Sequence, residues 1–342
     1  MKNFFYCLSC AFSLLGGIVG AGFITGSELI VFFGTDNFYL PLTLSCALLF
    51  FGFYISLTLA ENSGGLKHGL KKITPMSGVY ETFILLSSFF VLSAMIASLD
   101  ALSENIGISY PIFSVSSLFA ALFLAPLKTE GIRKINLILV PVSIIVVVFL
   151  ILYNGDLRFE KPLFTADFKS LFLSAPIYAF MNVFNSLPLT FSLGRSLGGK
   201  QRVFVSGLTA AISALFAALI LAFLKGSRGA INSAIPMGAA AGSGIFAVLF
   251  FVATFFAIFT SVIISYYPIY TAFDGKGKAR YSPVVLLFAF VFSRLGLNVI
   301  VKYAYALIGG IGGLFLINAA TFLLRNKKGK KYKKTFFENN TY

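Results

Sequence analysis

The chain has 342 residues, of which 58% are hydrophobic and only 11% are charged, and its mean hydropathy is +0.90. This composition excludes a soluble globular domain and indicates an integral membrane protein. The net charge of +15 would suit nucleic acid, but the basic residues lie between and after the apolar runs, as topology signals do. We therefore expect no nucleic-acid partner.

The first apolar run extends from about residue 4 to residue 33, long enough to span a bilayer with some tilt. Five of the eleven positions from Gly16 to Gly26 are glycine, and each glycine weakens a helix by about 1 kcal/mol relative to alanine. A helix interrupted at mid-membrane persists only where the break lines a cavity or binds a ligand. The alternative is close helix packing, because Gly16–Gly20 and Gly22–Gly26 are also small-xxx-small pairs.

Further apolar segments follow, separated by charged residues, and together they predict an all-α polytopic membrane protein. The ten segments cover about 4–33, 38–60, 79–103, 111–126, 134–153, 171–193, 203–224, 243–272, 282–295 and 299–324. The fourth and the ninth are short for a full span. With ten crossings and a cytoplasmic N-terminus, twenty lysines and arginines fall on the cytoplasmic side and six on the other, as the positive-inside rule requires. We predict ten transmembrane helices with both termini in the cytoplasm.

The segments divide into two blocks of five, which suggests a repeat. We predict one transmembrane domain over residues 1–325, with repeat one at about 1–153 and repeat two at about 171–325. An odd number of spans in each block gives the two halves opposite orientations, as an inverted repeat requires. Residues 326–342 form a basic tail, which we expect to attract anionic lipid headgroups by about 1 kcal/mol per basic residue near the surface.

If the repeat is real, the sixth segment corresponds to the first and should also be broken. It contains Pro176, Asn182, Asn185, Ser186 and Pro188 within one span. Pro188 removes a backbone donor and clashes with the preceding turn, and buried amides are costly in a membrane unless they are partnered. The alternative is a proline-kinked helix whose amides bond to neighbouring helices.

The eighth segment places two hydroxyls, Thr260 and Ser261, deep in an apolar helix. Hydroxyl and carbonyl oxygens are the ligands that a hard monovalent cation accepts, and an unwound first helix would supply carbonyls. In the alternative, each hydroxyl only bonds back to a carbonyl of the preceding turn.

Two carboxylates, Glu28 and Asp100, lie within apolar segments. An ionisable residue in a span is a functional candidate by default, so both are candidates for proton coupling. The alternatives are a donor on a neighbouring helix for Glu28 and an interfacial position for Asp100.

The first helix also carries a motif. Gly20-Ala21-Gly22-Phe23-Ile24-Thr25-Gly26-Ser27-Glu28, followed by Phe32-Phe33-Gly34, resembles the opening of YkvI-like bacterial membrane proteins. These belong to the amino acid–polyamine–organocation (APC) superfamily with the LeuT fold. The resemblance implies a secondary transporter in the bacterial cytoplasmic membrane, with a 5+5 inverted repeat and broken helices 1 and 6. It also implies a sodium ion, with ligands at Gly16, Val19, Ala257, Thr260 and Ser261.

Within that fold, the residues at the two breaks suggest how a solute would bind. Free N–H groups at the start of a half-helix can hold a carboxylate, and few intramembrane charges favour a neutral, apolar amino acid. The expected substrate-binding residues are Gly20, Ala21, Gly22, Phe23, Tyr178, Phe180, Asn182 and Asn185.

We expect cation-coupled symport of this small solute, with sodium favoured over the proton. The alternative is a membrane sensor of the same fold that binds an amino acid without significant transport. We do not expect an enzyme, because Cys, His and carboxylates do not gather in one place and no nucleophile–base pair is evident. Apart from a bound sodium ion, we expect no cofactor.

Overall fold

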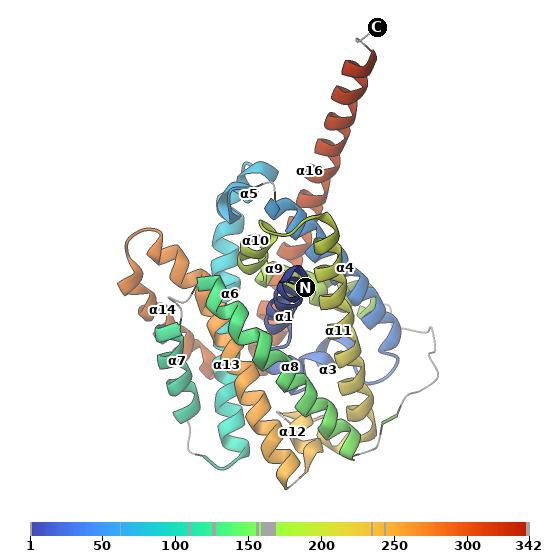
Figure 1. The fold of residues 1–342 in the computed structure, drawn as a ribbon. Helices are drawn as coiled ribbons and strands as arrows, with labels where there is room; N and C mark the ends of the chain where they lie inside the picture. The colour runs from blue at the N-terminus through green and yellow to red at the C-terminus, as the bar shows by residue number, and fades with distance from the viewer. Residues whose placement is uncertain are drawn as a thin grey trace.

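The computed structural model describes residues 2–61, 63–108, 111–124, 128–154, 157–158, 169–233, 235–242 and 244–339. Within these ranges every regular element is helical, and the long helices lie side by side in one bundle (Figure 1). Most of the expected polar linker between the two repeats lies outside the described residues, as do the side chains of the basic tail from residue 327 onward.

The helices are, in chain order, α1 (Lys2–Ile18), α2 (Ala21–Ile24), α3 (Ser27–Phe33), α4 (Tyr39–Glu61), α5 (Leu66–Ile73), α6 (Ser77–Asn105), α7 (Ile112–Leu124), α8 (Lys128–Asn154), η2 (Ser170–Ser174), α9 (Ala175–Asn185), α10 (Leu187–Gly194), α11 (Gly199–Gly226), η3 (Arg228–Ala230), α12 (Pro236–Ala241), α13 (Ile245–Asp274), η4 (Ala279–Tyr281), α14 (Ser282–Phe292), η5 (Ser293–Leu295), α15 (Leu297–Ile300), η6 (Val301–Tyr305) and α16 (Ala306–Asn339).

Six of these helices are long and apolar enough to cross a membrane, namely α4, α6, α8, α11, α13 and α16. The bent pair α9 and α10 makes a seventh span if it is counted as one. These spans support a multi-pass membrane protein, whereas the count of ten crossings stays a prediction. The reason is length: α7 has 13 residues and α14 has 11, while a helix needs about 20 residues to cross a hydrocarbon core of about 30 Å.

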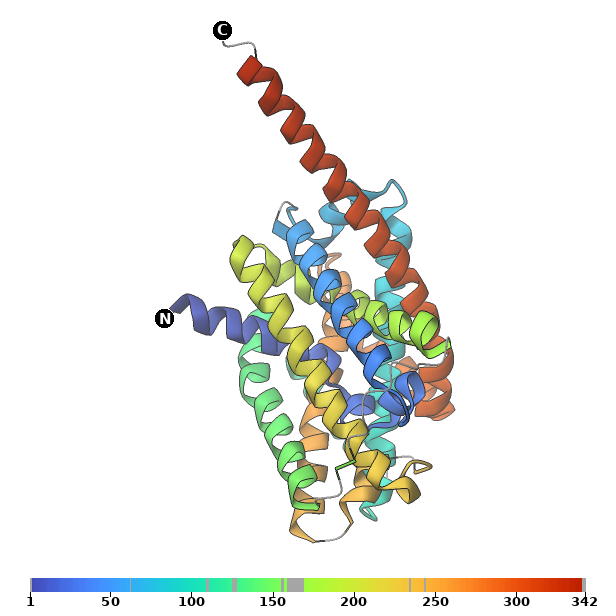
Figure 2. The ribbon, with the colours of Figure 1, turned by 90° about the vertical axis from the view of Figure 1, so that its right-hand side faces the viewer.

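The first predicted segment is divided at its glycines. α1 ends at Ile18, Gly20 has extended backbone (φ −91°, ψ −166°), and α2 begins at Ala21. A second irregularity follows at Gly26, whose φ of 79° is left-handed. Figure 2 shows α1 lying across the direction of the longer helices, with its N-terminal end projecting from the bundle. The predicted break in the first segment is therefore confirmed.

The sixth predicted segment bends by 59° between its two helices. α9 ends at Asn185 and α10 begins at Leu187, with Pro188 in its first turn. Proline is tolerated there because a first-turn N–H has no partner within the helix. The predicted interruption is therefore confirmed, and it coincides with the proline.

Two short helices occupy matching places in the two halves of the chain. α5 follows α4 and contacts α10, the second part of the sixth segment, and Gly69 lies against the ring of Phe191. α12 follows α11, and its Met237 N–H donates to the Thr25 carbonyl just after α2 at 2.9 Å. Each short helix thus contacts the broken segment of the other half of the chain.

Close packing of α16 on α9 depends on glycine at Gly309. A Cβ at Gly309 would lie 2.6 Å from the backbone carbonyl oxygen of Ile177, whereas one at Gly310 would meet nothing within 4 Å. We expect Gly309→Ala to cost about 1–3 kcal/mol of stability through overpacking, and Gly310→Ala to be neutral or stabilising by up to about 1 kcal/mol. Thermal unfolding of both variants in one detergent measures this, and equal losses would contradict the close contact.

Candidate substrate and ion site

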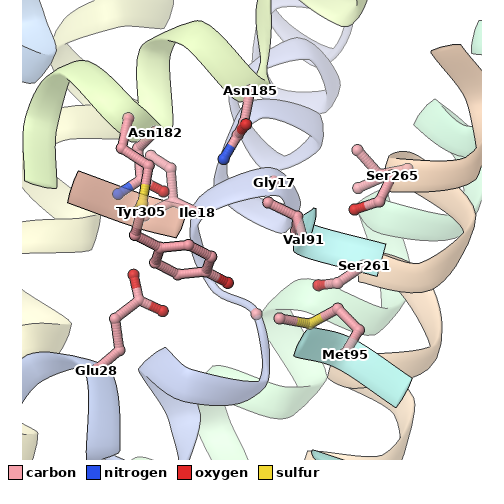
Figure 3. A pocket seen from close by; sticks show the side chains of 13 residues that line it. Gly17, Ile18, Glu28, Val91, Met95, Asn182, Asn185, Ser261, Ser265 and Tyr305 are labelled. Atoms are coloured by element: carbon pink, nitrogen blue, oxygen red, sulfur yellow. The ribbon is translucent and has the colours of Figure 1, made fainter. Parts of the chain in front are cut away.

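A small cavity lies where the two broken segments meet α6 and α13. Its volume is about 30 Å³, enough for an ion or one to two water molecules in this conformation. The polar side chains that line it are Glu28, Asn182, Asn185, Ser261, Ser265 and Tyr305 (Figure 3). The apolar lining comes from Ile18, Val91, Met95, Met181 and Ile264.

A second cavity of about 20 Å³ continues from the first along Asn185 and Ser265, which line both. It adds the hydroxyls of Ser88 and Ser186. The Asn185 Oδ1 and Ser186 Oγ atoms are buried and form no hydrogen bond in the described part of the chain. The bend between α9 and α10 therefore presents unpartnered polar atoms to the hollow.

The hydroxyls of α13 lie beside the end of α1. Ser261 Oγ donates to the Ala257 carbonyl at 3.0 Å and lies 3.5 Å from the Gly16 carbonyl oxygen, while Thr260 Oγ1 donates to the Ala257 carbonyl at 2.9 Å. The back-bonding alternative is therefore also observed. Because the hydroxyl hydrogens point at Ala257, the oxygen lone pairs stay available. Val19 is buried at the break, and its carbonyl forms no hydrogen bond within the described ranges.

Glu28 lies in the first turn of α3 with a side chain only 4% exposed. Its carboxylate lines the cavity and rests on Gly22, where a Cβ would lie 2.7 Å from Glu28 Oε2. Among the described residues, no hydrogen bond or ion pair to this carboxylate is present. The partner on a neighbouring helix that the sequence left open is thus not found in that part of the chain.

Asp100 lies in a different place. Its Oδ2 is 3.1 Å from Arg294 Nη1, in a cleft of about 480 Å³ that Glu104 also lines. This ion pair joins α6 to η5, and Asp100 does not line the central cavity. The structure therefore separates the two predicted proton-coupling carboxylates.

Three of the eight expected substrate-binding residues line the cavity, and they are Gly20, Asn182 and Asn185. Ala21, Gly22 and Phe23 are buried behind it, and their N–H groups form no hydrogen bond in the described part of the chain. Phe23 stacks on Phe216, with ring centroids 5.5 Å apart.

The two aromatic residues expected to line the side-chain pocket lie elsewhere. Tyr178 packs edge-on against Phe32 and Phe33, with ring centroids 5.4 and 5.0 Å apart. Phe180 lies against Gly313 of α16. Helix geometry explains the position of Phe180, because residues two apart point to different faces, so Phe180 faces away when Asn182 faces the cavity. Tyr178 shares a face with Asn182, and its ring packs against Phe32 and Phe33 instead.

No family model and no curated protein matches the sequence. Among solved structures, the chain is similar to MhsT in complex with L-phenylalanine, with a TM-score of 0.67 and 17% identity over 90% of this chain and 87% of that one. It is similar to a Na+-coupled sialic acid symporter, with a TM-score of 0.59 and 15% identity over 92% and 78%. It is also similar to a manganese transporter of Eremococcus coleocola, with a TM-score of 0.54 and 17% identity over 93% and 77%.

The chain has the LeuT fold. The LeuT fold was an expectation from the first-helix motif, and it is confirmed, whereas membership among YkvI-like proteins stays a prediction. In this LeuT-fold chain the central cavity includes side chains that the sequence analysis did not single out, namely Met95, Met181, Ser265 and Tyr305. Ser265 follows Ser261 by four residues and so shares its helix face, a signal that could have identified it. Tyr305 lies at the end of the π-helical turn η6, for which no comparable signal exists.

Proposed function

We propose that the protein is a secondary active transporter that moves a small solute together with a cation, and that the cation is sodium. The observation that supports this most directly is the meeting of the broken first segment with α13, where Ser261 reaches the Gly16 carbonyl. The similarity to MhsT and to a Na+-coupled symporter supports the same class of function.

The proposed sodium ligands are oxygens on two elements. Gly16 and Val19 would contribute backbone carbonyls, Ala257 a carbonyl of α13, and Thr260 and Ser261 hydroxyl oxygens. This all-oxygen set suits a hard cation. The ligand set would also couple ion binding to the conformational change, because the first segment and α13 must lie together for all five ligands to reach the ion.

For the solute, the sequence-based proposal is a neutral amino acid, with Gly20, Asn182 and Asn185 in contact and its carboxylate at the N–H groups of Ala21 to Phe23. For the coupling ion, the alternative to sodium is a proton carried by Glu28. Alternating access would follow from movement of the broken segments with α4 and α11 against the remaining helices.

The test is reconstitution into liposomes, after thermal-shift screening of the purified protein against amino acids and amines with and without sodium. Uptake that follows an imposed sodium gradient supports the proposal. Uptake that follows only a proton gradient would identify the proton, and not sodium, as the coupling ion. Binding without any uptake or counterflow would contradict transport and favour the ligand sensor.

We also propose that the basic tail binds anionic headgroups at the cytoplasmic face. The backbone of α16 continues to Asn339 and projects beyond the other helices (Figure 2), so the tail leaves the bundle at that end.

A further inference from the structure

The central cavity contains a carboxylate whose counter-charge the described chain does not supply. Glu28 is 4% exposed, and a buried carboxylate is costly unless it is paired or neutralised. Among the described residues, the buried and half-buried basic side chains are engaged elsewhere, in the pairs Arg133–Glu130, Arg202–Glu61 and Lys225–Asp36, and the more exposed Arg294 pairs with Asp100. A positive group from outside the chain would fit this position.

The carboxylate also lies where a substrate carboxylate would be expected. Glu28 Oε2 rests against Gly22, in the turn whose free N–H groups were proposed to hold an amino acid's carboxylate. A zwitterion bound there would bring a second carboxylate beside the first in a small space, and the two would repel each other. α2 has only four residues, so its positive end is weak, whereas the 17-residue α1 directs its negative end at the same point.

Both amides of the cavity also offer an acceptor oxygen. Asn182 Nδ2 donates to the Tyr178 carbonyl at 2.9 Å, which leaves the amide oxygen of Asn182 to accept. Asn185 Oδ1 is buried and forms no hydrogen bond within the described ranges. Figure 3 shows both amides and Glu28 around the ring of Tyr305. An ammonium group, with three donors and no acceptor, complements this set.

The remaining lining suits an alkyl group. Val91, Met95 and Met181 form apolar, polarisable walls, and the ring of Tyr305 offers a face to a cation. The volume of about 30 Å³ limits the part that enters in this conformation to the size of an ammonium head.

From this geometry we propose that the transported solute is a small primary amine without a carboxylate, and that its ammonium group binds Glu28, Asn182 and Asn185. The proposal rests on the transport function above and replaces the neutral amino acid as the substrate class. Sodium keeps its five proposed oxygen ligands at the end of α1 and on α13, of which Ser261 also lines the cavity.

The test compares three probes that differ by one group: ethylamine, L-alanine, which is ethylamine with an added carboxylate, and propionate, which lacks the amine. We expect ethylamine to stabilise the purified protein and to be taken up by proteoliposomes, and the other two to be inactive. Glu28→Gln keeps the shape and removes the charge, and should weaken ethylamine binding by about 10- to 100-fold, the strength of a charge-assisted hydrogen bond. Glu81→Gln makes the same change on α6, outside the cavity, and should change nothing.

The outcomes separate this proposal from the transport function. Sodium-driven uptake of L-alanine that Glu28→Gln leaves intact would overturn the amine proposal and leave the transporter standing. Proton-driven uptake of L-alanine that Glu28→Gln abolishes would overturn it as well, because Glu28 would then carry a proton. Ethylamine binding that Glu28→Gln removes, without flux of any probe, would support the amine site and contradict transport. Absence of ethylamine binding overturns the amine proposal.

Discussion

Replacing Thr260 and Ser261 together by alanine is expected to abolish the sodium dependence of solute binding and uptake. Both hydroxyls donate to Ala257, and Ser261 also reaches Gly16 on the first broken segment. Their oxygens are two of the five proposed ligands. Since an interaction with a charged group contributes about 1.5–3 kcal/mol, losing both should lower the apparent sodium affinity by about 100-fold or more.

The measurement is initial uptake into proteoliposomes as a function of external sodium, supported by the sodium-dependent thermal shift of the purified protein. Thr254→Ala is the matched control, because Thr254 is also a buried hydroxyl of α13 and lies two helical turns, or about 10 Å, before Ser261. Its Oγ1 has no partner in the described part of the chain. Sodium dependence that survives the double replacement would overturn the assignment of the ion site to Thr260 and Ser261.

The breaks in the backbone were predictable because local chemistry causes them. Glycines weaken the first segment around Gly20, and Pro188 cannot donate a hydrogen bond within the sixth; the structure has its interruptions at these places. The number of crossings was less predictable, because hydropathy finds apolar runs but not their helical length. α7 and α14 are helices, yet they are short ones.

The contents of the cavity were predictable only in part. Asn182 and Asn185 are polar residues in an apolar run, so their positions were visible, and both line the hollow. Phe180 carries no such signal, and its contact with Gly313 of α16 joins parts of the chain more than a hundred residues apart. The approach of Ser261 to the Gly16 carbonyl was expected only through the resemblance. Every residue has a backbone carbonyl, so nothing in the sequence itself marks the carbonyl of Gly16 as a ligand.

The first segment is also held by polar contacts near its N-terminal end. Arg133 of α8 donates to Ser9 at 2.6 Å and lies over the ring of Tyr6, 4.9 Å from its centroid, and Tyr6 bonds to Ser196 beyond α10. Polar contacts of this kind can be exchanged for water when a helix moves, whereas apolar contacts cannot. α1 is therefore fixed near its N-terminal end by exchangeable contacts, and the proposed sodium ligands Gly16 and Val19 lie at its other end, which is the arrangement that the proposed transport cycle needs.

The second large effect is expected at Gly26, where the first segment turns into α3. Its φ is 79°, and a Cβ there would lie 2.5 Å from Leu224 Cδ1. For Gly26→Ala we expect about 1–2 kcal/mol of backbone strain and about 1–3 kcal/mol of overpacking, because Leu224 is fully buried. The loss should also displace Glu28, two residues further along, and so weaken solute binding.

Gly34→Ala is the control that separates the two causes. Gly34 has a φ of 67° and a ψ of −175°, a region that is essentially restricted to glycine, and a Cβ added there would meet no atom within 4 Å, so its replacement should cost only backbone strain, of about 1–3 kcal/mol. Thermal unfolding of both variants in one detergent, with ligand binding measured on each, gives the comparison. A loss of stability for Gly26→Ala no larger than that for Gly34→Ala would show that the Leu224 side chain moves to accommodate the added methyl group. The contact between α3 and α11 would then not be what fixes Glu28 in the cavity.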